Sequence, residues 1–225
     1  MIIGILTAMQ SEHDLLASLL NNKEIKNVNE FSFLHGTMGK HEIILIQCGI
    51  GKVNATIGTT ELIRNYAPQC IISTGVAGGI DQRLSVMDVV VSEQTVYHDV
   101  WCGMGCEHGQ IQGFPTFFNA TENLVKAAVS LNGKQESKIH KGLICTGDQF
   151  ITDDNRLSEI KNNFKEAIAV DMESAAFAHC CYMKQVPFVS IRVISDTPGK
   201  DNNIEQYNNF WEVAPEKSFD VIKDL

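Results

Sequence analysis

The stretch that most constrains the fold is Ile168–Ala175, where a short apolar run meets two carboxylates and then a series of small residues. The apolar run has the character of a buried strand, and the small residues that follow have that of a helix. In α/β sheets, ligands bind beyond the carboxyl ends of the strands, so this position predicts that Glu173 faces a cleft. The alternative is that Asp171 and Glu173 only cap the helix, because acidic residues are favoured in a first turn.

Length and charge narrow the class of protein. A chain of 225 residues with 44% hydrophobic content is typical of one α/β domain, which we expect to span residues 1–225. The formal net charge of -9 disfavours a nucleic-acid partner, whose binding surface would be basic. The apolar start at residues 1–7 is too short to span a bilayer, and we expect no membrane partner.

Cysteine usage indicates a reducing compartment. The chain has seven cysteines, and the adjacent pair Cys180 and Cys181 lies in a helical pattern, so we expect free thiols and a cytoplasmic location. His98, Cys102, Cys106 and His108 form the one cluster with metal-ligand residue types. Their spacing does not match a zinc site, and we expect neither a metal nor a cofactor.

The periodicity of the first half predicts alternating strands and helices. Residues 2–7 read as a strand, followed by a helix with Ser11 as its N-cap and Glu12 in its first turn. Residues 31–38 and 42–47 are predicted to form a hairpin. The Gly49-Ile50-Gly51 turn lacks the third glycine of a dinucleotide site and the Ser or Thr of a phosphate loop, so it predicts a tight turn into a helix.

The second half repeats the pattern of an apolar strand that ends in polar groups. The strand from residue 70 opens into a glycine-rich loop whose backbone can approach a ligand. Further strands are predicted at residues 88–93, 141–145 and 186–194, and the last ends in Ser195-Asp196. Residues 94–118 exceed normal loop length, which indicates a functional or interfacial segment.

Six motifs in order carry a family resemblance over nearly the whole chain. They are Gly4-Ile5-Leu6-Thr7-Ala8-Met9 with Glu12, Cys48-Gly49-Ile50-Gly51-Lys52-Val53-Asn54-Ala55, Ser73-Thr74-Gly75-Val76-Ala77-Gly78-Gly79, Thr146-Gly147-Asp148 with Phe150-Ile151, Val170-Asp171-Met172-Glu173, and Arg192-Val193-Ile194-Ser195-Asp196. Together they resemble the 5′-methylthioadenosine/S-adenosylhomocysteine nucleosidase family of the nucleoside phosphorylase superfamily. The resemblance implies a three-layer α/β/α sandwich with a mixed, partly barrel-like central sheet.

The resemblance also implies a role for each of three carboxylates. Cleaving an N-glycosidic bond builds negative charge on the leaving base and needs an acceptor for the proton of water. By resemblance, Asp196 is the acid that protonates the adenine and Glu12 activates the water. Glu173 resembles the residue that binds the ribose hydroxyls, with Met172 packed on the sugar, while Asp171 is expected to be structural.

The remaining implied contacts surround the substrate. Phe150 and Ile151 would read the adenine, Ser73 and Arg192 would help to hold the water, Ala77 and Gly78 would line the adenine side, and Ile50 and Tyr207 would line the alkylthio pocket. The resemblance implies a homodimer in which residues 101–118 lie near the partner's site.

The residues before the Ser-x-Gly turn bear on whether the nucleophile is water or phosphate. Phosphate needs cationic or amide clamps, and related phosphorylases carry an arginine a few residues before the Ser-x-Gly turn, where this chain has Cys70-Ile71-Ile72. Water is therefore the expected nucleophile, and the resemblance implies a hydrolase that releases adenine from the purine nucleosides 5′-methylthioadenosine and S-adenosylhomocysteine. Three alternatives stay open: a nucleosidase for aminodeoxyfutalosine or adenosine, a purine nucleoside phosphorylase, and a non-catalytic nucleoside-binding protein.

Overall fold

The computed structural model describes residues 1–134, 137–198, 202–213 and 220–224. Within these residues the chain forms ten strands and seven helices. The strands are β1 (Ile2–Thr7), β2 (Asn21–Val28), β3 (Phe31–Met38), β4 (His41–Gln47), β5 (Cys70–Gly79), β6 (Val89–Tyr97), β7 (Phe118–Asn119), β8 (Ile139–Thr146), β9 (Ala167–Asp171) and β10 (Phe188–Asp196). The helices are α1 (Gln10–Leu19), α2 (Lys52–Tyr66), α3 (Glu122–Val129), α4 (Asp154–Asn163), α5 (Ser174–Lys184), α6 (Asn203–Val213) and α7 (Asp220–Asp224).

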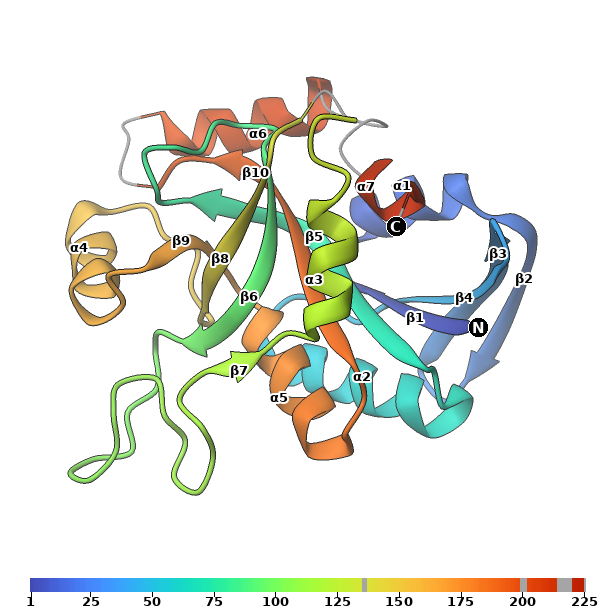
Figure 1. The fold of residues 1–225 in the computed structure, drawn as a ribbon, viewed down its shortest axis with the longest axis horizontal. Helices are drawn as coiled ribbons and strands as arrows, with labels where there is room; N and C mark the ends of the chain where they lie inside the picture. Colours follow the sequence, from blue (N-terminus) through green and yellow to red (C-terminus); the bar gives the residue numbers. More distant parts are fainter. Residues whose placement is uncertain (135–136, 199–201, 214–219, 225) are drawn as a thin grey trace.

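All ten strands belong to one mixed sheet that partly closes on itself. The strand order is β10-β6-β8-β9-β5-β1-β4-β3-β2, with β7 beside β6, and β10 also pairs with β5. This last pairing closes β5, β6, β8, β9 and β10 into a barrel, and the other strands extend from it (Figure 1). One buried cluster draws all its members from these five strands, so apolar side chains fill the barrel. Its members are Ala77, Val90, Ile144, Ile168, Ala169 and Ile194.

Helices cover both faces of the sheet. One large apolar cluster joins the sheet to α1, α3, α6 and α7, and a second joins it to α2 and α5, which pack along the opposite face (Figure 1). The helix α5 supplies buried small residues, which let it lie close to the strands. The predicted α/β/α sandwich with a partly barrel-like sheet is therefore confirmed.

Several predicted elements differ from the observed ones for local reasons. The hairpin at residues 31–47 is present as β3 and β4. The prediction that Ser11 caps α1 is wrong, because the helix begins at Gln10 after the N-cap residue Met9. Strand β6 continues to Tyr97, beyond the predicted end at residue 93, since pairing with β8 carries it on past a register shift. Strand β2 has no buried side chain, and no apolar pattern signals it.

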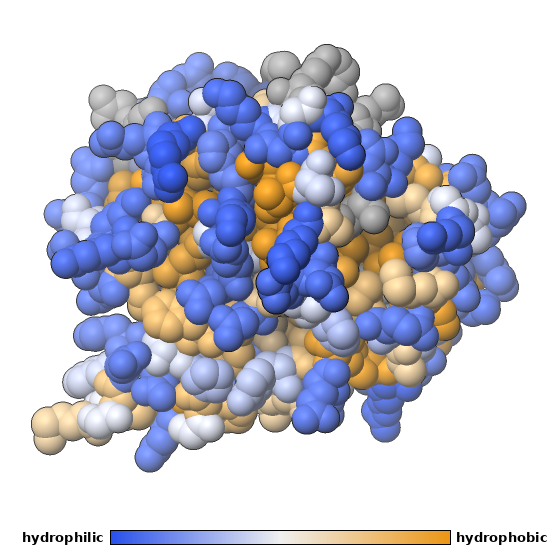
Figure 2. Space-filling model, viewed as in Figure 1, coloured by the Kyte–Doolittle hydropathy of each residue, from blue (hydrophilic) through white to orange (hydrophobic). Residues whose placement is uncertain are grey.

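The segment between β6 and β7 forms two long loops that project beyond the sheet (Figure 1). Trp101 and Met104 on these loops are 60% and 99% exposed. On the face seen in Figure 2, charged and polar residues cover most of the surface, and apolar residues show between them in separate areas. No helix in the described part of the chain is both long and apolar enough to cross a membrane.

Candidate active site

A cavity of about 350 Å³ opens where residues after the carboxyl ends of β1, β4, β8, β9 and β10 meet. This volume is in the range of small-molecule sites. Among the described residues that line it, four are acids and none is lysine or arginine. The lining residues are Ala8, Met9, Glu12, Ile50, Val76, Ala77, Gly78, Gln149, Phe150, Ile151, Val170, Asp171, Met172, Glu173, Ser195, Asp196, Pro198 and Tyr207.

Asp196 reaches the cavity from the last residue of β10. The pairing of β10 with β5 shifts register between Ile194 and Asp196, and such a bulge redirects the side chains around it. The Ser195 hydroxyl donates to Asp196 Oδ1 at 2.7 Å, and Asn203 Nδ2 lies 3.4 Å from Oδ2. Burial raises the pKa of Asp196, although both hydrogen bonds oppose the rise. The site therefore favours a carboxyl group that can carry a proton and give it up.

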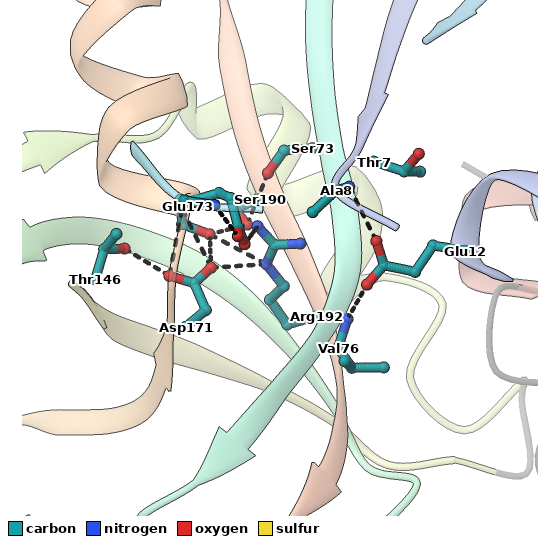
Figure 3. A network of polar contacts seen from close by, with 12 residues as sticks. Thr7, Ala8, Glu12, Ser73, Val76, Thr146, Asp171, Glu173, Ser190 and Arg192 are labelled. Atoms are coloured by element: carbon teal, nitrogen blue, oxygen red, sulfur yellow. Dashed lines mark hydrogen bonds and ion pairs between the residues drawn. The ribbon is translucent and has the colours of Figure 1, made fainter. Parts of the chain in front are cut away.

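Glu12 is held by backbone N–H groups on two elements. As the third residue of α1 it reaches back, and its Oε2 accepts from the N–H groups of Ala8 and Met9, each at 3.0 Å. Its Oε1 accepts from Val76 N on β5 at 3.1 Å (Figure 3). A Cβ atom at Gly75 would lie 2.4 Å from this oxygen, so a side chain there would displace Glu12.

Two opposing effects act on the Glu12 carboxyl. Burial raises its pKa, and the nearby Arg192 guanidinium and three backbone N–H groups act in the lowering direction. The group is thus a buried carboxylate in a fixed orientation, and its raised pKa makes it able to accept a proton from a bound water.

The sequence left open whether Asp171 and Glu173 cap α5 or face the cleft, and the two residues differ in this respect. Asp171 makes the cap, because its Oδ2 accepts from Ser174 N at 3.2 Å. Glu173 occupies the N-cap position of α5 without a side-chain cap bond. Its Oε1 instead accepts from Gly51 N at 2.9 Å, and its side chain lines the cavity. Burial raises the pKa of Glu173, and Arg192 counteracts that effect.

Arg192 lies behind the cavity and is 1% exposed. Its Nε donates to Asp171 Oδ2 at 2.8 Å, and its Nη2 lies 3.9 Å from Glu173 Oε2 (Figure 3). Ser73 is also buried and donates to Ser190 Oγ at 3.0 Å. Neither Arg192 nor Ser73 is among the residues that line the cavity. Both residues lie in a polar network behind the cavity, and their role in holding the water stays a prediction.

The structure brings the other predicted site residues together at the cavity. Phe150 is 48% exposed, and its ring meets that of Tyr207 edge to face at a centroid distance of 5.2 Å. The other predicted residues that line the cavity with apolar side chains or backbone are Ile50, Ala77, Gly78, Ile151 and Met172.

Sequence reasoning missed some residues of the site. Met9 and Pro198 line the cavity, and Tyr207 Oη donates to Met9 Sδ at 3.5 Å. The buried Asn203 contacts both Asp196 and the Ile151 carbonyl from α6, a helix that the sequence reading did not include. The only available signal was proximity along the chain to the motifs at Glu12 and Asp196. Within the described residues, no group of three or more His, Cys, Asp or Glu is arranged to hold a metal ion.

Comparisons with known proteins agree with this geometry. Residues 2–225 match the model of the phosphorylase superfamily. A 5′-methylthioadenosine/S-adenosylhomocysteine nucleosidase of Bacillus thuringiensis is 40% identical, with 94% of this chain and 92% of that protein covered. The structure of such a nucleosidase from Colwellia psychrerythraea in complex with adenine has a TM-score of 0.94 and 34% identity, and covers 100% of this chain and 93% of its own.

A third relative carries a different name on the same fold. The futalosine hydrolase of Helicobacter pylori superposes with a TM-score of 0.92 at 31% identity and covers 99% of this chain and 96% of its own. The extent of the family match and the 40% identity over almost the full length decide the assignment. The chain belongs to the phosphorylase superfamily and, within it, to the 5′-methylthioadenosine/S-adenosylhomocysteine nucleosidase family.

Proposed function

We propose that the protein hydrolyses the N-glycosidic bond of 5′-methylthioadenosine and S-adenosylhomocysteine and releases adenine. The observation that carries this proposal is the convergence of Glu12, Glu173 and Asp196, from three separate elements, on one cavity. The named relatives, one of them with adenine bound, support the same substrate class.

The three carboxylates supply the steps that this hydrolysis needs. Asp196 gives its proton to a ring nitrogen of the adenine as the bond between the sugar and the base breaks, so the base leaves without negative charge. Glu12 takes a proton from the water whose oxygen bonds to the anomeric carbon. Glu173 binds the ribose hydroxyls, and its charge favours the cation-like sugar of the transition state. One proton leaves Asp196 and one arrives on Glu12, so the step balances, and proton exchange with solvent returns both carboxyl groups to their starting states.

The charge of the cavity favours water over phosphate as the nucleophile. A phosphate dianion needs cationic or backbone N–H partners, and the described lining residues contain four acids without a lysine or arginine. Arg192 is a nearby cation, but it does not line the cavity, and its Nε is paired with Asp171. A phosphate entering here would meet several carboxylates, which disfavours the phosphorylase alternative.

The assay that tests the proposal measures adenine release in phosphate-free buffer. We expect turnover of 5′-methylthioadenosine and S-adenosylhomocysteine with free sugar as the co-product and no acceleration by phosphate. A phosphate requirement with a sugar phosphate as product would establish a phosphorylase instead. Tight nucleoside binding without turnover would establish a binding protein.

The substituent on the 5′ carbon of the sugar is the least constrained part of the substrate. Ile50 and Tyr207 lie on a loop and on α6, outside the strands. The similarity to a futalosine hydrolase favours aminodeoxyfutalosine as an alternative substrate, and adenosine is a second alternative. Comparing kcat/KM for these nucleosides with that for 5′-methylthioadenosine ranks them, and a preference for aminodeoxyfutalosine or adenosine would reassign the substrate.

We further propose that the protein acts as a homodimer in which residues 101–118 approach the partner's site. Met104 is 99% exposed on this segment, and Val53 and Met183 expose 70% and 59% of their surface on α2 and α5. Exposed large apolar residues on neighbouring elements are typical of an interface.

Light scattering after gel filtration tests the dimer. We expect twice the chain mass of 24.9 kDa. Met104→Asp should weaken the dimer, because a charge would enter an apolar contact, whereas Ile25→Asp on the distant strand β2 should not. A monomer at micromolar concentration in the unaltered protein would refute the proposal.

The seven free cysteines support a cytoplasmic location, which cell fractionation would test.

A further inference from the structure

Lys52, the first residue of α2, lies in an ion-pair network at the edge of the site. Its Nζ contacts Asp99 Oδ1 at 2.8 Å and Oδ2 at 2.7 Å, and lies 3.6 Å from Asp148 Oδ2. The Lys52 and Asp99 side chains are 22% and 15% exposed. This partial burial distinguishes the pair from surface ion pairs, which contribute little.

Backbone hydrogen bonds reinforce the same three residues. Lys52 N donates to Asp148 Oδ1 at 2.8 Å, and Asp148 N donates to Asp99 Oδ2 at 2.9 Å. Gly51 has φ of +94°, and a Cβ atom there would lie 3.0 Å from Asp148 Oδ1, so glycine permits this close approach. Burial alone would raise the pKa of Asp99, but Lys52 and the Asp148 N–H outweigh it and leave that pKa below its usual range.

Each of the three segments joined by this network carries part of the cavity or of the proposed interface. The loop before Lys52 contains Ile50 and Gly51, and Gly51 N orients Glu173. The loop after β8 contains Asp148 and continues into Phe150 and Ile151. Asp99 lies just before the segment of residues 101–118, which carries the exposed Trp101 and Met104. The network thus connects the sugar side, the base side and the projecting loops.

We propose that Lys52 is a positioning residue, which, with Asp99 and Asp148, fixes the base-reading loop against the loop that orients Glu173 and so sets the affinity for the nucleoside. Lys52 acts through these loops and is absent from the residues that line the cavity. The effect on catalysis rests on the proposed nucleosidase function. The effect on the loops does not depend on it.

The test uses Lys52→Met, which keeps most of the side-chain length and removes the charge. Because hydrogen bonds to charged groups are involved, we expect KM for 5′-methylthioadenosine to rise at least about tenfold while kcat stays within about threefold. Lys52→Arg should recover much of the affinity. Combining Lys52→Met with Asp99→Asn should cost less than the sum of the two single changes, since both remove the same contact.

A second measurement keeps the test independent of turnover. Hydrogen exchange of residues 147–151, followed by mass spectrometry without ligand, should be faster in Lys52→Met than in the unaltered protein. The matched control is Lys141→Met, which removes an ion pair to Glu93 at 2.6 Å outside the cavity and should change neither KM nor exchange in residues 147–151.

The possible outcomes separate the two proposals. An unaltered protein without turnover would refute the nucleosidase function, and the exchange experiment would still test the network. An unchanged KM or unchanged exchange in Lys52→Met would overturn the positioning role. A large fall in the melting temperature, with kcat and KM affected together, would also overturn it, because that result indicates a general structural role.

Discussion

Replacing Asp196 with asparagine is expected to lower kcat for adenine release by about 10²- to 10⁴-fold, the usual contribution of a general acid. Asparagine preserves the shape of the side chain and its possible contacts with Ser195 and Asn203, but it cannot supply the proton. KM should change little, because Glu173 and the apolar walls of the cavity are retained. Steady-state kinetics on 5′-methylthioadenosine measure both quantities, and a kcat near that of the unaltered protein would remove Asp196 from the mechanism.

The same variant should be more stable than the unaltered protein at neutral pH. Burial raises the pKa of Asp196 in the folded state, so the folded state binds the proton more tightly than the unfolded state. Ionised Asp196 therefore opposes folding at pH 7, and asparagine removes this cost. The gain in melting temperature should shrink as the pH falls and vanish below the unfolded pKa of about 3.9. A constant gain at all pH values would contradict this explanation.

Replacing Arg192 with methionine is expected to lower the free energy of unfolding by about 3 to 5 kcal/mol, the range for breaking a buried ion pair from one side. Arg192 is 1% exposed and lies near the carboxylates of Asp171, Glu173 and Glu12. Its removal leaves Asp171 buried without its cation. Urea unfolding followed by circular dichroism measures the loss.

Two further variants test whether burial is the cause. Arg83→Met removes an ion pair to Asp81 at 2.9 Å on the surface, where Arg83 is 73% exposed, and should leave unfolding nearly unchanged. Adding Asp171→Asn to Arg192→Met should recover part of the lost stability, because the unpaired buried charge is also removed. If Arg192→Met unfolds like the unaltered protein, the Asp171–Arg192 pair does not have this role.

The sequence predicted the strands whose apolar runs end in polar groups and missed the elements without such a pattern. Strands β1, β5, β9 and β10 are buried along most of their length, so their apolar runs identify them as strands in the sequence. Strand β2 is exposed and α6 lies beyond the motifs, and neither has a comparable signal. That residues 1–225 form one independently folding domain stays a prediction.

At the site, too, short motifs predicted some features, and contacts between distant segments decided the others. Motif positions predicted that Glu12, Glu173 and Asp196 would converge, and the fold places all three at one cavity. They did not distinguish the residues that line the cavity from those behind it, which include Arg192 and Ser73. Their burial depends on contacts with Asp171 and Ser190, which come from other strands and which residue type alone does not reveal.

The placement of the cavity walls has a consequence for how such enzymes diversify. Glu173 directly follows β9 and Asp196 ends β10, two strands of the closed barrel, whereas Ile50 and Tyr207 belong to a loop and a helix outside it. Mutations in those outer segments can accumulate after gene duplication without disturbing the barrel. A lineage can thus acquire a new nucleoside as substrate and keep its inherited chemistry.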